Sequence, residues 1–89
     1  MLKNEKVYNQ VIVTLLNLGL NVSEFTTPDE DSFVLSKKPF FVEGVQVEDG
    51  IYITIEQYSE TLQDYVEIFA KVYKTAKPAL NKIRKVLLV

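Results

Sequence analysis

Residues 40–58 organise this chain, because two apolar stretches there flank the polar triplet Glu48-Asp49-Gly50. Such a pattern predicts a β-hairpin. We expect a three-residue loop with Gly50 in the left-handed conformation, which pairs Val47 with Ile51. A two-residue Asp49-Gly50 turn would mix apolar and polar positions on both faces, so the pattern favours the longer loop. One face of this hairpin then carries Val45, Val47, Ile51, Ile53 and Ile55.

Residues 59–77 predict a long amphipathic helix directly after the hairpin. Their apolar side chains fall within an arc of about 120° at 100° per residue, the width of a surface helix that packs on one side. Thr61-Leu62-Gln63-Asp64 matches the capping-box pattern, and Ser59 is an alternative N-cap. Pro78 ends or kinks this helix, because the residue before a proline disfavours the α region. The apolar positions are Leu62, Tyr65, Val66, Phe69, Val72, Tyr73 and Ala76.

A helix is also predicted at each end of the chain. Residues 4–18 have apolar side chains over nearly half of the helix circumference, so this helix packs on two sides or is partly buried by another chain. Gly19 ends it as the C′ residue, with Leu20 placed for the contact of a Schellman motif. The last helix spans residues 78–88 with Pro78 at N1, and the chain ends in the apolar Val86-Leu87-Leu88-Val89.

Between the first helix and the hairpin, residues 21–26 and 32–36 predict two short strands. The intervening Thr27-Pro28-Asp29-Glu30-Asp31-Ser32 is a loop with three consecutive acids, but it lacks the glycine and the distal glutamate of a calcium-binding EF-hand loop. We therefore expect a solvated turn there and no metal site. Lys37-Lys38-Pro39 forms the turn that leads into the hairpin.

These elements predict a small α+β domain that spans residues 1–89 as one unit. The expected order is α-β-β-β(-β)-α-α, with an antiparallel sheet of three or four strands and the helices packed on one face. The expected core comprises Ile12, Leu15, Leu16, Val45, Ile51, Ile53, Leu62, Val66, Phe69 and Val72.

The net charge of −2 conceals a strong segregation along the chain. Residues 24–67 hold eleven acids against two lysines, a balance of −9, whereas residues 68–89 hold six basic residues and no acid, a balance of +6. One explanation is the long helix, whose macrodipole favours acids at its start and lysines at its end. The other explanation is a partner that recognises one of the two charges.

The residue inventory excludes most catalytic chemistry. The chain has no histidine and no cysteine, so triads of the Ser-His-Asp and Cys-His kinds, thiolate metal sites and disulfides are absent. Its three glycines form no phosphate-binding loop. We expect a protein that is not an enzyme and has no cofactor. The N-terminal residues lack a signal-peptide pattern, and no apolar run reaches the ~18 residues that span a bilayer, so we expect a cytoplasmic protein.

Tyrosines give the best candidates for a binding surface. In the expected register, Tyr52 and Tyr58 lie opposite the Val/Ile face, together with Phe40 and Val42. Tyrosine suits interfaces because it buries a large ring while keeping a polar tip. Either this band binds a protein partner, with Asp49 and Glu56 among the acids that would mimic phosphates, or another part of the chain covers it. The surplus of apolar surface also predicts a homodimer.

A second candidate surface is the basic C-terminal region, a nucleic-acid patch formed by Lys71, Lys74, Lys77, Lys82, Arg84 and Lys85. The expected αβββα order is similar to that of double-stranded-RNA-binding domains, but the second helix begins with Ser59-Glu60-Thr61 and carries no positive charge there. This likeness concerns topology alone and indicates no family. The sequence thus favours a non-enzymatic protein-binding or regulatory module, such as an inhibitor or adaptor. The alternatives are a nucleic-acid-binding protein and a structural homodimer without a separate ligand site.

Overall fold

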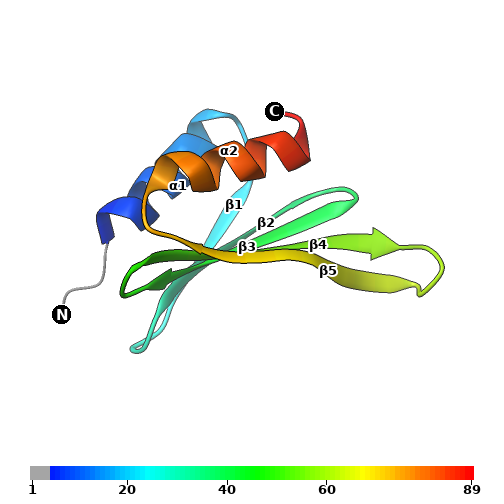
Figure 1. Ribbon diagram of the computed structural model, residues 1–89, viewed down its shortest axis with the longest axis horizontal. Helices are drawn as coiled ribbons and strands as arrows, with labels where there is room; N and C mark the ends of the chain where they lie inside the picture. Colours follow the sequence, from blue (N-terminus) through cyan, green and yellow to red (C-terminus); the bar gives the residue numbers. More distant parts are fainter. Residues whose placement is uncertain (1–4) are drawn as a thin grey trace.

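The chain forms a five-stranded antiparallel sheet with two helices on one of its faces (Figure 1). The computed structural model describes the backbone of residues 5–89 and the side chains from Lys6 onward. Each strand pairs with the next one along the chain, so the sheet is a simple meander. The element order is α1 (Glu5–Asn17), β1 (Val22–Thr26), β2 (Asp31–Lys37), β3 (Phe40–Val47), β4 (Gly50–Ser59), β5 (Asp64–Tyr73) and α2 (Ala76–Leu87).

The α+β class and the antiparallel sheet are confirmed, but two element counts differ from the prediction. The sheet has five strands instead of three or four, and two helices replace the expected three. Both differences have one origin, because the predicted long helix over residues 59–77 is the strand β5. The first helix agrees with the prediction over residues 5–17; Asn4, its expected first residue, lies outside the described residues.

The sequence of β5 has the apolar spacing of a helix for two reasons. Both faces of the strand are partly apolar, and the alternation of its side chains between the two faces is broken once. Its pairing with β4 shifts between Ile55 and Glu56, where Ile68 becomes an extra residue on β5. Such a β-bulge inverts the side-chain alternation, which spaces the apolar residues as in a helix. The content of β-branched and aromatic residues, including Val66, Ile68 and Val72, favours the strand.

The predicted helix cap is a turn. Ser59 Oγ accepts a hydrogen bond from the Leu62 N–H at 3.2 Å, the donor three residues on that an N-cap would also satisfy. Gln63 then adopts a positive φ of 57°, and the chain reverses into β5. Serine side chains accept hydrogen bonds from backbone N–H groups in turns as well as at helix starts. The predicted capping role of Ser59 is therefore present, but it stabilises a turn and not a helix start.

The β3–β4 register is shifted by one residue from the predicted one. Val47 pairs with Gly50 and Gly44 pairs with Ile53, so the turn is Glu48-Asp49. Gly50 does have a positive φ, as expected. The shift places Gly44 under the helices, where the ring of Phe33 from β2 occupies the space that a Cβ would need. Phe33 therefore packs in the space above Gly44 in the core.

The core lies between the sheet and the helices. From α1 it takes Val7, Tyr8, Val11, Ile12 and Leu15, from the strands mainly Phe33, Leu35, Val42, Ile51, Ile53 and Ile55, and from α2 Ala76, Ala79, Ile83 and Leu87. Four predicted core residues, Ile12, Leu15, Ile51 and Ile53, are buried.

The remaining predicted core positions are at or near the surface. Phe69 is half-buried against the core, and Val45 is half-buried on the opposite face of the sheet. Four of them are exposed, so their prediction as core residues is wrong: Leu16, Leu62, Val66 and Val72. The last three of these lie in β5 or the turn before it, where the helical interpretation misplaced them.

The end of α1 and the start of α2 follow local rules. Gly19 has a φ of 84°, its N–H donates to Leu16, and the Leu20 N–H donates to the Leu15 carbonyl, which confirms the predicted Schellman motif. α2 starts at Ala76, and Pro78 lies in its first turn, where a missing N–H costs nothing. Over the described residues, neither helix has the length and apolar character needed to cross a membrane.

Candidate functional site

The face of the sheet turned away from the helices carries no covering layer in the described part of the chain (Figure 1). We call it the open face and define it by the strand residues that alternate with the buried ones. Its apolar members are unusually many for a solvated face. The open face comprises Ser23, Phe25, Ser32, Val34, Ser36, Phe41, Glu43, Val45, Val47, Tyr52, Thr54, Glu56, Tyr58, Tyr65, Glu67, Ala70 and Val72.

Three aromatic side chains form a cluster at one end of the open face. The Phe41 and Tyr65 ring centroids are 6.1 Å apart, and Tyr58 meets Tyr65 edge to face at 5.4 Å. These are favourable ring geometries. Tyr58 and Tyr65 are each 37% exposed, so the cluster keeps apolar area in contact with water.

A small pocket lies against this aromatic cluster. It has a volume of about 310 Å³ and is lined by Lys38, Pro39, Tyr58 and Tyr65. The β2–β3 turn forms one wall, and the Tyr58 N–H donates a hydrogen bond to the Pro39 carbonyl at 2.8 Å, which joins that wall to β4. A concave site beside exposed aromatic rings is the arrangement that accepts an apolar anchor from a protein partner.

The charged strand positions of the open face are all acidic. Glu43 faces Thr54 on β4, whereas Glu56 on β4 lies directly opposite Glu67 on β5. Like charges at opposed positions of neighbouring strands destabilise a sheet. The chain therefore maintains an unfavourable pair beside Phe41, and a basic partner would relieve it.

The structure divides the predicted aromatic band between the two faces of the sheet. Tyr52, Tyr58 and Glu56 do lie on the open face. Phe40 and Val42 lie on the helix-covered face, and Val42 is fully buried, so their assignment to a binding band is wrong. The one-residue register shift explains the error, because it exchanges the two faces of β3.

Asp49 is separated from the aromatic cluster. It lies in the β3–β4 turn, seven residues along the strand from Glu56, a distance of about 23 Å at 3.3 Å per residue. Sequence reasoning missed Phe25, Phe41, Tyr65 and Val72 as members of the open face. The alternation of β3 around Phe41 contained that signal, but Tyr65 and Val72 were hidden by the helical interpretation of β5.

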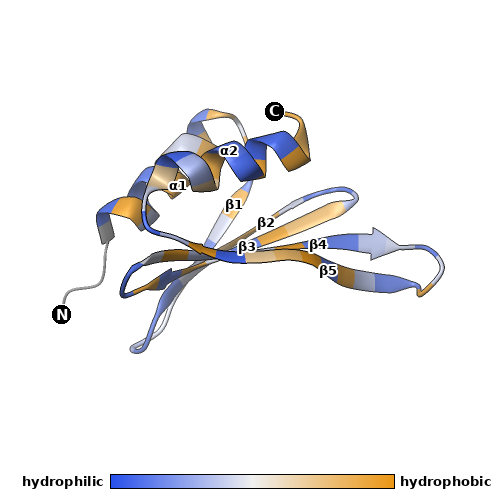
Figure 2. Ribbon diagram, in the orientation of Figure 1, coloured by the Kyte–Doolittle hydropathy of each residue, from blue (hydrophilic) through white to orange (hydrophobic). Residues whose placement is uncertain are grey.

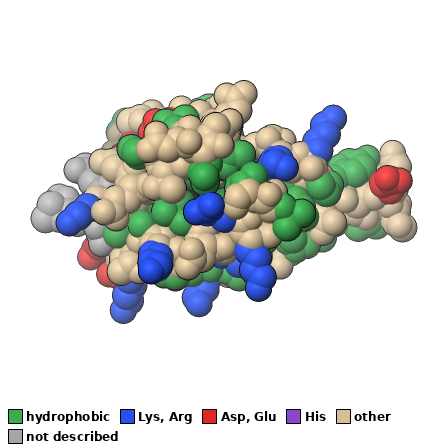
Figure 3. Space-filling view, turned by 90° about the horizontal axis from the view of Figure 1, so that it is seen from above, with side chains coloured by type: hydrophobic (Ala, Val, Ile, Leu, Met, Phe, Trp, Pro, Cys, Tyr) green, Lys and Arg blue, Asp and Glu red, His purple; other side chains and the backbone are tan. Residues whose placement is uncertain are grey.

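The basic residues of the predicted nucleic-acid patch surround α2. The ammonium groups of Lys82 and Lys71 lie over the rings of Phe69 and Tyr73, at 4.3 and 5.2 Å from the centroids. Lys77 and Arg84 lie on the side of α2 that faces α1. Lys74 and Lys85 are exposed. Figure 3 shows basic side chains over the helix layer and along one edge of the molecule, and few acidic ones in this view.

The acidic β1–β2 turn is held by its own threonine. Thr27 Oγ1 accepts hydrogen bonds from the N–H groups of Asp29 and Glu30, at 3.3 and 3.1 Å. Over residues 6–89 no group of three or more carboxylates is arranged to hold a metal ion.

No family model, no curated protein and no solved structure is significantly similar to this chain. Its candidate sites therefore rest on their own geometry and chemistry.

Proposed function

We propose that this protein is a non-enzymatic binding module whose protein partner docks on the open face of the sheet. The observation that carries the proposal is the exposed aromatic cluster of Phe41, Tyr58 and Tyr65 with its adjacent pocket, on a face without a covering layer in the described chain. Phe25 and Val72 add apolar surface elsewhere on the open face, with 53% and 45% of their surfaces exposed.

The charges of the open face favour a partner with a basic rim. Glu43, Glu56 and Glu67 surround or border the aromatic positions, and the strand residues of this face include no base. Complementary charges accelerate association and exclude wrong partners. Docking of two open faces on each other would instead oppose acids to acids, which makes the homodimer a weaker alternative.

A protein with such a binding face would act as an inhibitor or as an adaptor. A module without catalytic groups acts by occupying a surface of another macromolecule. An aromatic anchor supplies the buried contact, and the surrounding acids supply orientation.

The test compares two double variants in a capture experiment from the native cell extract. Tyr52→Ala/Tyr58→Ala removes two rings from the open face, whereas Leu16→Ala/Leu88→Ala removes exposed apolar side chains elsewhere. We expect the tyrosine variant to lose a partner that wild type and the control retain, since truncation of an interface anchor costs at least about 1–2 kcal/mol. Circular dichroism verifies that both variants are folded.

Equal capture by both variants would contradict the proposal. Sedimentation of the purified wild type completes the test. If a dimer forms and the tyrosine variant abolishes it, the open face serves self-association, and the structural homodimer replaces the heterologous partner.

A further inference from the structure

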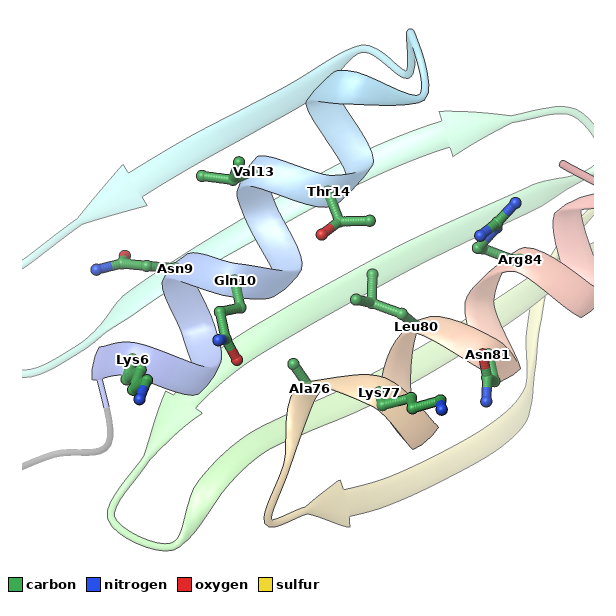
Figure 4. Close-up of a pocket in the computed structure, with 10 residues that line it drawn as sticks. All are labelled: Lys6, Asn9, Gln10, Val13, Thr14, Ala76, Lys77, Leu80, Asn81 and Arg84. Atoms are coloured by element: carbon green, nitrogen blue, oxygen red, sulfur yellow. The ribbon is translucent and has the colours of Figure 1, made fainter.

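The outer surface of the helix layer contains a groove between α1 and α2, on the opposite side of the molecule from the open face. Its volume is about 730 Å³. In Figure 4, Gln10 and Thr14 point from α1 toward α2, and Leu80 points from α2 toward α1. Val13, Ala76 and Leu80 make much of the lining apolar, and polar side chains of both helices border it.

Helical spacing places the polar groups along both walls. On α2, Lys77, Asn81 and Arg84 recur at intervals of four and three residues. On α1, Lys6 and Gln10 are also four residues apart. Residues at this spacing share one helix face, so a row of polar side chains runs along each helix beside the groove.

The groove has a single sign of charge. Its lining includes the cations Lys6, Lys77 and Arg84 and the amides of Asn9, Gln10 and Asn81, and no carboxylate lies among its described lining residues. Arg84 Nε donates to the Val89 carbonyl at 3.2 Å, which orients the guanidinium and leaves its four Nη hydrogens for a ligand.

The charge segregation cannot come from the macrodipole of one long helix over residues 59–77, because that helix does not form. Glu60, Asp64 and Glu67 lie in or before β5, so no helix macrodipole links them to the lysines that follow. Arg84 and Lys85 do lie in the last turn of α2, where the macrodipole of that shorter helix favours cations. Two of the six basic residues in residues 68–89, Lys77 and Arg84, line the groove. A polyanionic ligand of the groove would give these two a shared role.

We propose that the α1–α2 groove binds the phosphate backbone of a nucleic acid. Lys77 and Arg84 are seven residues apart on α2, about 10.5 Å along the helix axis. This separation lets the two cations contact different phosphates of one strand. Among its described lining residues the groove has no aromatic ring on which bases would stack, so it binds the backbone with little sequence preference.

The experiment is an anisotropy titration of a labelled single strand and a labelled duplex of arbitrary sequence, each about 20 nucleotides long, between about 50 and 200 mM salt. With two or three phosphates neutralised, the slope of log K against log salt is about −2 to −3. Lys77→Gln/Arg84→Gln lowers the magnitude of this slope by about 2, since each phosphate contact contributes about 1.

The matched control is Lys37→Gln/Lys74→Gln, which removes the same charge from two exposed positions outside the groove, the end of β2 and the link between β5 and α2. We expect this variant to keep the affinity and slope of wild type. Equal losses in both variants would indicate attraction by net charge alone and overturn the assignment to the groove. Absence of binding at about 10 μM protein in 50 mM salt would also overturn it.

Two further arms separate the possible explanations. If polyglutamate binds the groove while neither nucleic acid binds, the ligand is an acidic peptide and the proposal is wrong. Tyr52→Ala/Tyr58→Ala should bind nucleic acid as wild type does. If the groove does not bind nucleic acid, the proposed role of the open face is unaffected. Likewise, loss of the protein partner in the tyrosine variant does not affect the proposal for the groove.

Discussion

Tyr8 shows what single residues contribute to this fold. Its ring is buried between α1 and β2, tilted against Phe33 with 6.2 Å between ring centroids. Its hydroxyl has no hydrogen-bond partner in the described structure. Burial, followed by the negative charges of Glu24 and Asp31, raises the pKa of the Tyr8 hydroxyl to about 12.

Tyr8→Phe should stabilise the protein. Removal of a buried hydroxyl without a partner relieves a desolvation cost, so the free energy of unfolding at pH 7 should rise by about 1 kcal/mol. Wild type should lose stability as the pH rises from about 10 to about 12, because the unfolded chain ionises Tyr8 before the folded chain does. The variant should lose less, with a remaining loss from Tyr73, whose pKa burial also raises.

Denaturant titrations at pH 7 and at several pH values up to 12 measure both effects. A less stable variant at pH 7 would show that the hydroxyl has a partner, such as an ordered water. An unchanged alkaline profile would show that Tyr8 does not govern this part of the pH dependence.

At the scale of elements, the sequence was sufficient wherever a local rule decides the conformation. The end of α1 at Gly19, the positive φ of Gly50 and the antiparallel β3–β4 pair all follow from turn and cap chemistry. The register of that pair could not be predicted in this way. It was chosen to place the apolar side chains of both strands on one face, whereas both faces of the sheet carry apolar residues. Long-range packing decides it, since Phe33 from β2 fills the space above Gly44.

The prediction of a helix over residues 59–77 was the larger error, because β5 lies there. This error also hid the candidate site. A bulge at Ile68 and apolar side chains on both faces gave a strand the periodicity of a helix. Single-sequence periodicity cannot separate these cases, because the bulge depends on pairing with β4. Once β5 is a strand, Tyr65 joins Tyr58 and Phe41, and the aromatic cluster becomes visible.

The opposed Glu56 and Glu67 on β4 and β5 give a prediction for this pair of elements. Glu67→Gln should raise the free energy of unfolding by about 0.2–1 kcal/mol, because it removes a like-charge cross-strand pair. Added salt of about 1 M should abolish the difference, since it screens the repulsion. Thermal melts at low and high salt provide the measurement.

Glu43→Gln is the matched control, because Glu43 faces Thr54 and has no opposed acid. It should leave the melting temperature almost unchanged. A destabilised Glu67→Gln would mean that the two carboxylates are stabilised by another contact, and the argument for a basic partner would lose this support.

At the scale of the molecule, the two sides differ in chemistry. The helix layer presents a basic groove, whereas the open face presents aromatic rings among acids. The β4–β5 hairpin projects beyond the helices (Figure 1) and carries Tyr58 and Tyr65 of the aromatic cluster. Figure 2 shows an apolar tip on this hairpin, and Leu62 in its turn is 66% exposed. The fold thus presents two surfaces of different chemistry on opposite sides of the sheet.

Site-specific photo-crosslinking in cells tests the role of the open face most directly. A benzophenone amino acid replaces Tyr58 in the aromatic cluster in one variant and the exposed Leu16 of α1 in the other. We predict a discrete adduct with a second protein from position 58 and none with that protein from position 16. No adduct from position 58, an identical set from both positions, or an adduct of only twice the 10.2 kDa chain mass would contradict a heterologous partner on this face.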